Sequence, residues 1–148
     1  MSMPWTIVHV PPRAVRWTCP EPGFSLTHGL VGLWRHPEIV MFDVPRQQAA
    51  GYLGTLARRI EDGAEFRPGR VLHDLHEHFR FALVAVTDTA VLGRLAARAG
   101  RSIPPGPVVQ LVWPDICGTL PWEHGYDPAV SGLTQPVLGP WPGRTPRG

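Results

Sequence analysis

One short stretch constrains this chain more than any other, because it passes without a break from a buried strand into a helical pattern. EIVMFDV (38–44) is rich in β-branched and aromatic residues, which predicts a central β-strand. Pro45 follows at once and suits the first turn of a helix, where its missing N–H costs nothing. Gly63 supplies a C-terminal stop, and between these two residues apolar side chains recur at spacings of three and four, at Ala49, Leu53, Leu56, Ala57 and Ile60.

The rest of the pattern predicts further strands and one more helix. A helix is expected at 89–100, and strands are expected at 5–10, 14–18, 24–33 (an extended, glycine-punctuated segment), 66–71, 78–86 and 108–113. Because these elements do not alternate regularly, we expect an α+β fold: a mixed, largely antiparallel sheet covered on one face by two helices. The 148 residues suit a single domain, with 140–148 as a loose tail.

Composition argues against several classes of protein. The net charge is only +2, and the 14 basic residues are all arginines scattered along the chain, so no basic stripe for nucleic acid is predicted. No stretch approaches the ~20 apolar residues of a membrane span. The N-terminus, MSMPWTIVHV, lacks the pattern of a secretory signal, which predicts a cytoplasmic protein. Cys19 and Cys117 form no CxxC pair and are expected to be free thiols.

The strongest candidate for chemistry is His36-Pro37-Glu38, at the entry to the central strand. Histidine titrates near neutral pH and can act as acid or base, and Glu38 would lie on the same side as His36 if the chain is extended there. Asp115 follows the last predicted strand, where site residues are often displayed. Each also has a structural interpretation: His36 bonding to the backbone, Glu38 pairing with an arginine such as Arg35, and Asp115 capping a turn.

Cofactor motifs are missing from the sequence. His73, His76 and His78 stand close together but lack the spacing of a zinc signature, so no metal site is predicted. The glycines fit neither a P-loop nor a dinucleotide-binding pattern, and no GxSxG elbow occurs. We therefore expect chemistry without a cofactor.

Four motifs in order carry a resemblance to a known family: FSLTHGL, HPEIVMFDVP, VVQLVWPDICGTLPWEHGYD and QPVLG. Over roughly residues 24–139 the chain resembles the bacterial DUF4262 domain family, which implies a small cytoplasmic domain and no particular activity. Leu26 replaces the family's aromatic residue, and Arg35 replaces the glycine before the histidine. A weaker similarity leads to suppressor-of-fused-like domains, which include toxin-immunity proteins. The family pattern falls on Thr27, Gly29, Leu30, His36, Pro37, Glu38, Pro45, Gln110, Pro114, Asp115, Pro121 and Trp122.

Two functions are compatible with these residues. In the first, which we favour, the domain is a small-molecule enzyme or ligand-binding protein for proton transfer (isomerase, cyclase, lyase or hydrolase type), with His36 as acid or base, assisted by Glu38 and Asp115. Its substrate would be held by Thr27, His28, Gln110, Trp113 and Trp122. In the second, it is a protein-binding module, such as an immunity-like or regulatory partner, because tryptophan and arginine are frequent interface anchors. The expected partners are a small molecule or a protein, with a homodimer compatible with both and no nucleic acid or membrane.

Overall fold

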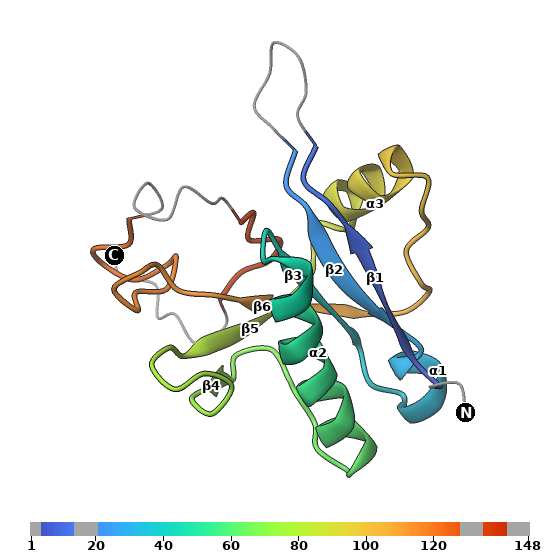
Figure 1. Cartoon of the computed structure of the whole chain (residues 1–148), viewed down its shortest axis with the longest axis horizontal. Helices are drawn as coiled ribbons and strands as arrows, with labels where there is room; N and C mark the ends of the chain where they lie inside the picture. The colour runs from blue at the N-terminus through green and yellow to red at the C-terminus, as the bar shows by residue number, and fades with distance from the viewer. Residues whose placement is uncertain (1–3, 14–20, 128–134, 142–148) are drawn as a thin grey trace.

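The computed structural model describes residues 4–13, 21–127 and 135–141, and shows one six-stranded sheet with helices on both sides (Figure 1). The sheet order is β1-β2-β3-β6-β5-β4. Among the described strands, β3 and β6 form the only parallel pair, and every other neighbouring pair is antiparallel. The strands are β1 (Thr6–Val10), β2 (Phe24–His28), β3 (Glu38–Phe42), β4 (Val71–Leu72), β5 (Phe81–Ala85) and β6 (Val108–Val112). The helices are α1 (Leu30–Trp34), α2 (Arg46–Glu61) and α3 (Thr89–Arg98).

The predicted fold class is confirmed, but the two long helices lie on opposite faces of the sheet and not on one. α2 packs on the face that carries Ile39 and Leu111, whereas α3 packs on the face that carries Val40 and Phe42. The reason lies in the central strands, since every residue of β3 and β6 is buried. Because both faces of these central strands are buried, each face of the sheet needs a covering layer, and one long helix packs on each.

Three predicted elements differ from the structure, and one lies outside the described residues. The second half of 24–33 forms α1 instead of continuing as an extended segment. Only Val71 of the 66–71 segment is in a strand, because Pro68-Gly69 makes a turn, although Gly69 N–H still donates to the Leu83 carbonyl oxygen (2.8 Å). The strand expected at 78–86 is shorter and begins at Phe81. The strand predicted at 14–18 falls outside the described residues.

The segment 135–139 runs across the α3 face and completes it. The Gln110 side chain on β6 donates to the Pro136 carbonyl oxygen (2.6 Å) and accepts from the Leu138 N–H (2.9 Å). The Leu138 side chain is buried in the cluster beneath α3. A Cβ atom on Gly139 would overlap the carbonyl oxygen of Ala85, so only glycine fits there. Gln110 therefore attaches the segment 135–139 to the centre of the sheet.

None of the helices in the described part of the chain combines the length and the apolar character needed to cross a bilayer.

Arg35 ends α1 in a left-handed backbone conformation, with φ 54° and ψ 30°. This is the position at which the family resemblance expects glycine, and the φ value explains that preference. Replacing Arg35 by glycine should raise the free energy of unfolding by about 0.5–1 kcal/mol, because relief of about 1–3 kcal/mol of strain exceeds the added entropy of an unfolded glycine. Arg35→Ala is the matched control, since it removes the side chain and keeps the strain. Equal urea unfolding midpoints for the two variants would contradict the prediction.

Candidate functional site

The Glu38 carboxylate binds the chain segment that enters α1. It is 1% exposed and accepts four hydrogen bonds. Oε1 accepts from the Thr27 hydroxyl (2.9 Å) and the Leu30 N–H (3.1 Å), and Oε2 accepts from the N–H groups of Gly29 (3.1 Å) and Val31 (3.2 Å). These N–H groups have no partner within the helix, so Glu38 supplies the cap that Gly29 cannot give. Its contacts are those of a structural carboxylate.

The His36 ring is buried, and both of its nitrogen atoms are occupied. Nδ1 lies 2.8 Å from the Pro37 carbonyl oxygen, and Nε2 accepts from the Phe66 N–H at 2.9 Å. The Phe66 bond requires an unprotonated Nε2, so the proton belongs on Nδ1, where it is donated to Pro37. The ring also stands edge-on to the Phe66 ring, with 6.1 Å between centroids. His36 thus joins the loop before β3 to the segment after α2.

His36 and Asp115 do not share a site. β3 and β6 are neighbours, as expected, but they are parallel, with Glu38 opposite Val108. His36 precedes β3 and Asp115 follows β6, so the two lie at opposite ends of this parallel strand pair. At ~3.3 Å per strand residue, they are on the order of 20 Å apart. Only antiparallel pairing would have brought them together.

The Asp115 carboxylate organises the loop that follows β6. Oδ1 accepts from the N–H groups of Cys117 and Thr119 (both 2.9 Å), and Oδ2 accepts from the Asp127 N–H (3.0 Å). These bonds, with Thr119 first and Asp127 next, lower the pKa of Asp115 below its ordinary value, while burial opposes them. Asp115 is therefore ionised at neutral pH.

This shift predicts an acid-dependent contribution to stability. Because the pKa of Asp115 is lower in the folded chain, its stabilising effect is present above the ordinary aspartate pKa of about 4 and disappears as the pH falls through the folded value. Asp115→Asn should lower Tm at pH 7 and leave it close to the wild-type Tm at about pH 2. Thermal unfolding between these pH values measures the difference, with the exposed Glu61→Gln as control. A Tm difference that is constant with pH would contradict it.

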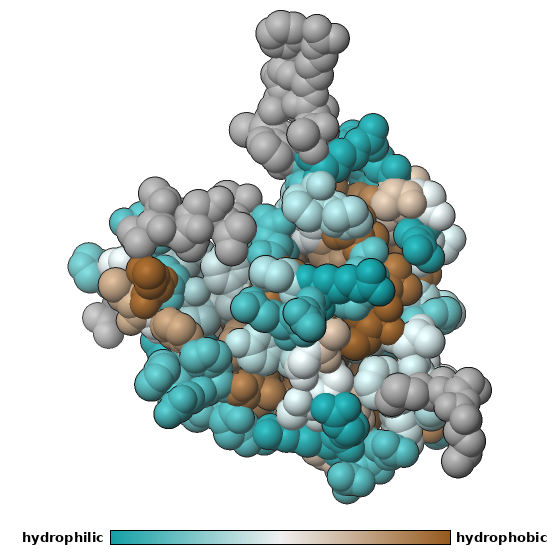
Figure 2. Space-filling model, viewed as in Figure 1, coloured by the Kyte–Doolittle hydropathy of each residue, from teal (hydrophilic) through white to brown (hydrophobic). Residues whose placement is uncertain are grey.

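Asp115 and Trp113 also line a cavity at the carboxyl ends of β3 and β6, beside the first turns of α2. Its volume is about 330 Å³. Figure 2 looks onto the α2 face and shows apolar surface on both sides of that helix. A second cavity of about 370 Å³ lies over the ends of β1 and β2, and both are lined by Asp43-Val44-Pro45, the turn into α2. Ligands of open α/β sheets commonly bind at such strand ends.

Family membership follows from a comparison with family models. The model described as "Domain of unknown function (DUF4262)" matches residues 3–127. The chain belongs to the DUF4262 family. The match begins before β1, whereas the resemblance read from the motifs covered 24–139. No curated protein and no solved structure matches the chain, and the similarity to suppressor-of-fused-like domains is not shown.

In this DUF4262 chain the five residues expected to hold a substrate are dispersed. The Thr27 hydroxyl donates to Glu38 and accepts from the Ile39 N–H (2.8 Å), so it belongs to the α1 cap. His28 is exposed at the end of β2. Gln110 holds the segment 135–139, and Trp122 stacks on Trp141 with 4.6 Å between centroids. Only Trp113 lines the cavity.

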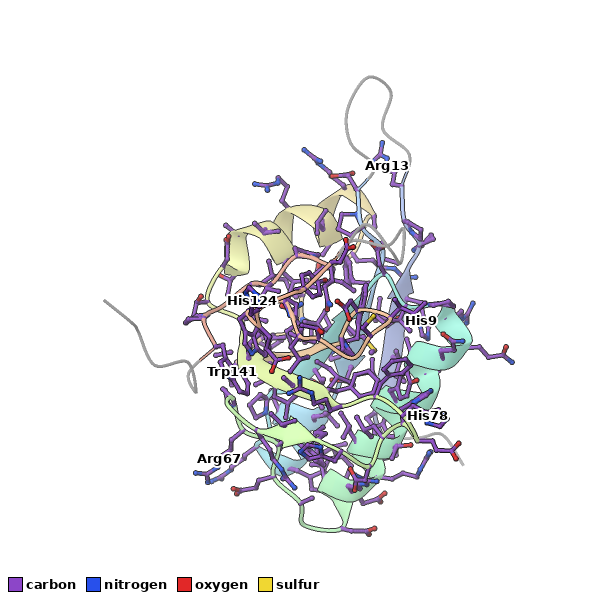
Figure 3. The ribbon with its side chains drawn as sticks, turned by 90° about the vertical axis from the view of Figure 1, so that its left-hand side faces the viewer. His9, Arg13, Arg67, His78, His124 and Trp141 are labelled. Atoms are coloured by element: carbon purple, nitrogen blue, oxygen red, sulfur yellow. The ribbon has the colours of Figure 1, made fainter. Side chains whose placement is uncertain are left out.

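Figure 3 turns the molecule so that the loops after β6 face the viewer, with His124 and Trp141 among them and His78 toward α2. In the described ranges, no group of three His, Cys, Asp or Glu side chains is placed to hold a metal ion. Instead, His76 Nδ1 accepts from the His78 N–H (3.0 Å), which orients one imidazole toward the cavity it lines.

Most of the cavity wall was not predicted from the sequence. Tyr52 lies inside the helix pattern of the sequence, and Phe79 and Phe81 fall in the strand predicted at 78–86. The strand predicted at 38–44 includes Asp43, although β3 ends at Phe42 and Asp43 has a φ of 53°. The available signal was the polar Asp43 between a buried strand and Pro45, because a charged residue at that boundary often faces a strand-end site.

Proposed function

We propose that this DUF4262 domain binds a small organic molecule in the cavity at the carboxyl ends of β3 and β6. One observation carries the proposal: the cavity has ligand size and a mostly apolar wall that includes a few polar residues. Its volume of about 330 Å³ falls within the usual range of ligand pockets, ~300–1,000 Å³. The polar and charged residues that line it are Asp43, Gln48, His76 and Asp115.

Acid–base catalysis by His36 receives less support than ligand binding. Both of its ring nitrogens are held by backbone groups, and a proton added to Nε2 would break the bond from Phe66. A catalytic base must lie within hydrogen-bond reach of the proton it removes, and His36 is remote from this cavity. The catalytic roles of His36, Glu38 and Asp115 and the protein-binding alternative stay predictions.

Ligand-observed NMR with a library of soluble aromatic and alicyclic fragments tests the proposal. Gln48→Trp places a large ring at the cavity wall from an exposed helix position. Gln47→Trp is the matched control, because Gln47 is exposed one residue earlier on α2 and does not line this cavity. We expect several fragments to compete for one site, and to lose binding in Gln48→Trp but not in Gln47→Trp.

Two results would refute the proposal. One is that no fragment binds the folded wild-type protein at millimolar concentration. The other is that fragments bind equally well to both tryptophan variants, which would place their site elsewhere on the molecule.

A further inference from the structure

A histidine and a serine on neighbouring strands form a hydrogen-bonded pair at the second cavity. His9 on β1 lies directly opposite Ser25 on β2 in the register of the sheet. The His9 Nδ1 atom and the Ser25 hydroxyl oxygen are 2.8 Å apart. Both residues line the cavity of about 370 Å³ over the ends of β1 and β2. A hydroxyl and a base within hydrogen-bond reach of each other are the geometry of nucleophilic catalysis, which recurs on unrelated folds.

The pair lies on the face of the sheet that carries α2. Side chains alternate between the two faces along a strand, and Ile7, two residues before His9, packs against the core cluster on the α2 face. Phe24 and Leu26, the neighbours of Ser25, belong to the cluster on the α3 face, so Ser25 points the other way. Figure 3 shows His9 beside the first turns of α2. Ser25 is only 3% exposed, so a molecule inside the cavity would meet its hydroxyl largely away from bulk water.

The surroundings of His9 keep its ring in the form that accepts a proton. Burial lowers the pKa of His9 below its ordinary value, and the positive charge of Arg46 lowers it further. The ring is therefore mostly neutral at neutral pH. A neutral imidazole that carries its proton on Nε2 accepts the hydrogen bond of the Ser25 hydroxyl at Nδ1.

Arg46 adds a positive charge near the reacting atoms. It lines the same cavity from the first position of α2, and its charge acts on His9. A guanidinium group there would stabilise the negative oxygen that develops when a hydroxyl attacks a carbonyl group. Asp43, the other charged residue among the described lining residues, accepts from the Gly23 N–H at 2.8 Å. The apolar side chains of the wall are those of Val10, Pro11, Pro12, Phe24, Val44 and Pro45.

We propose that the second cavity hydrolyses esters with an apolar acyl group, with Ser25 as the nucleophile and His9 as the base. The Ser25 oxygen attacks the carbonyl carbon of the ester while its proton moves to His9 Nδ1. The ester C–O bond then breaks, and the leaving alcohol takes that proton from His9. Water attacks the acyl-serine and gives a proton to His9, which returns it to the Ser25 oxygen as the carboxylic acid leaves. This activity does not depend on the ligand proposed for the cavity at the ends of β3 and β6.

An alkyl fluorophosphonate tests the pair directly. The Ser25 oxygen would form a bond to phosphorus and release fluoride, and His9 would take the hydroxyl proton. Trypsin cuts after arginine, which places Ser25 on the peptide 17–35 and separates it from the other three serines of the chain. We expect mass spectrometry to find the label on peptide 17–35. The protein should also hydrolyse para-nitrophenyl butyrate, measured as released nitrophenolate.

Two variants remove one partner each, and each has a matched control. Ser25→Ala should abolish the label and the hydrolysis, whereas Ser102→Ala, at an exposed serine, should keep both. His9→Gln leaves a hydrogen-bonding side chain beside Ser25 but removes the base, so both reactions should slow by about 100-fold. His28→Ala changes an exposed histidine of the same tryptic peptide and should react at the wild-type rate. Circular dichroism checks that each variant is folded.

Three results would overturn the inference. The folded wild-type protein could take no label on peptide 17–35 at millimolar probe, Ser25→Ala could react as fast as the wild type, or His9→Gln could do so. Because the label is mapped in the wild-type protein, the first result decides even if a variant fails to fold. None of these results bears on the cavity tested by Gln48→Trp, so the two proposals stand or fall separately.

Discussion

Replacement of Glu38 by alanine is expected to lower the free energy of unfolding by about 4 kcal/mol. The change removes the acceptor of four hydrogen bonds and leaves the buried Thr27 hydroxyl and Leu30 N–H without that partner. Each unsatisfied buried donor costs about 1–3 kcal/mol, while the partly buried Gly29 and Val31 N–H groups recover some of the loss by bonding to water. Such a loss approaches the whole stability of a small domain, about 5–15 kcal/mol.

Equilibrium urea unfolding, followed by circular dichroism, measures the effect. Glu38→Gln should cost less than Glu38→Ala, because the amide oxygen still accepts. Glu61→Ala, at an exposed position near the end of α2, should change the stability by no more than about 0.5 kcal/mol. A Glu38→Ala protein as stable as Glu61→Ala would mean that Glu38 does not hold α1, and its burial would then need a functional explanation.

Replacement of His36 by alanine is expected to lower the free energy of unfolding by about 3 kcal/mol. The buried Phe66 N–H loses its acceptor, and the missing ring leaves a void against the Phe66 side chain. His28→Ala is the matched control, since His28 is exposed and should tolerate the change.

The same measurement separates a structural His36 from a catalytic one. If His36→Ala unfolds at the wild-type urea concentration, the Phe66 bond contributes little and a chemical role becomes the better explanation. Binding of a library fragment to the cavity offers a second readout in the variant that stays folded. His36 precedes β3, and the cavity lies at the carboxyl ends of β3 and β6. The dissociation constant of a molecule bound in the cavity should therefore be unchanged by His36→Ala.

Much of the fold was predictable from the sequence because local signals agreed with burial. Helix α2 follows from its apolar spacing and from Gly63, which takes a φ of 101° after the helix end. The central strand was predicted at 38–44 and is β3, Glu38–Phe42. The position of α3 was also correct, and Asp88 caps it by accepting from the Val91 N–H. Each of these elements carries its own stop or start signal.

The predictions that the structure corrects concern contacts between segments that are distant in sequence. The parallel pairing of β3 with β6 leaves no local signal, and it alone decides whether His36 lies near Asp115. Helix α1 contains a glycine and begins at a residue without a side-chain cap, so its five residues read as extended chain. Its cap is supplied by Glu38, eight residues beyond Leu30. A sequence shows that a carboxylate is present but not which N–H groups surround it.

The docking of 135–139 has a consequence for the order in which the chain can mature during synthesis. All six strands have been made once Val112 is added, yet the sheet then has an uncovered strip at its centre, where the Gln110 amide lacks both partners. Only after Leu138 and Gly139 emerge can the strip close, so residues made well after the last described strand complete the middle of the sheet and not its margin. The limits of the family match, 3–127, are therefore narrower than the unit that folds, and a boundary drawn at residue 127 would divide a core.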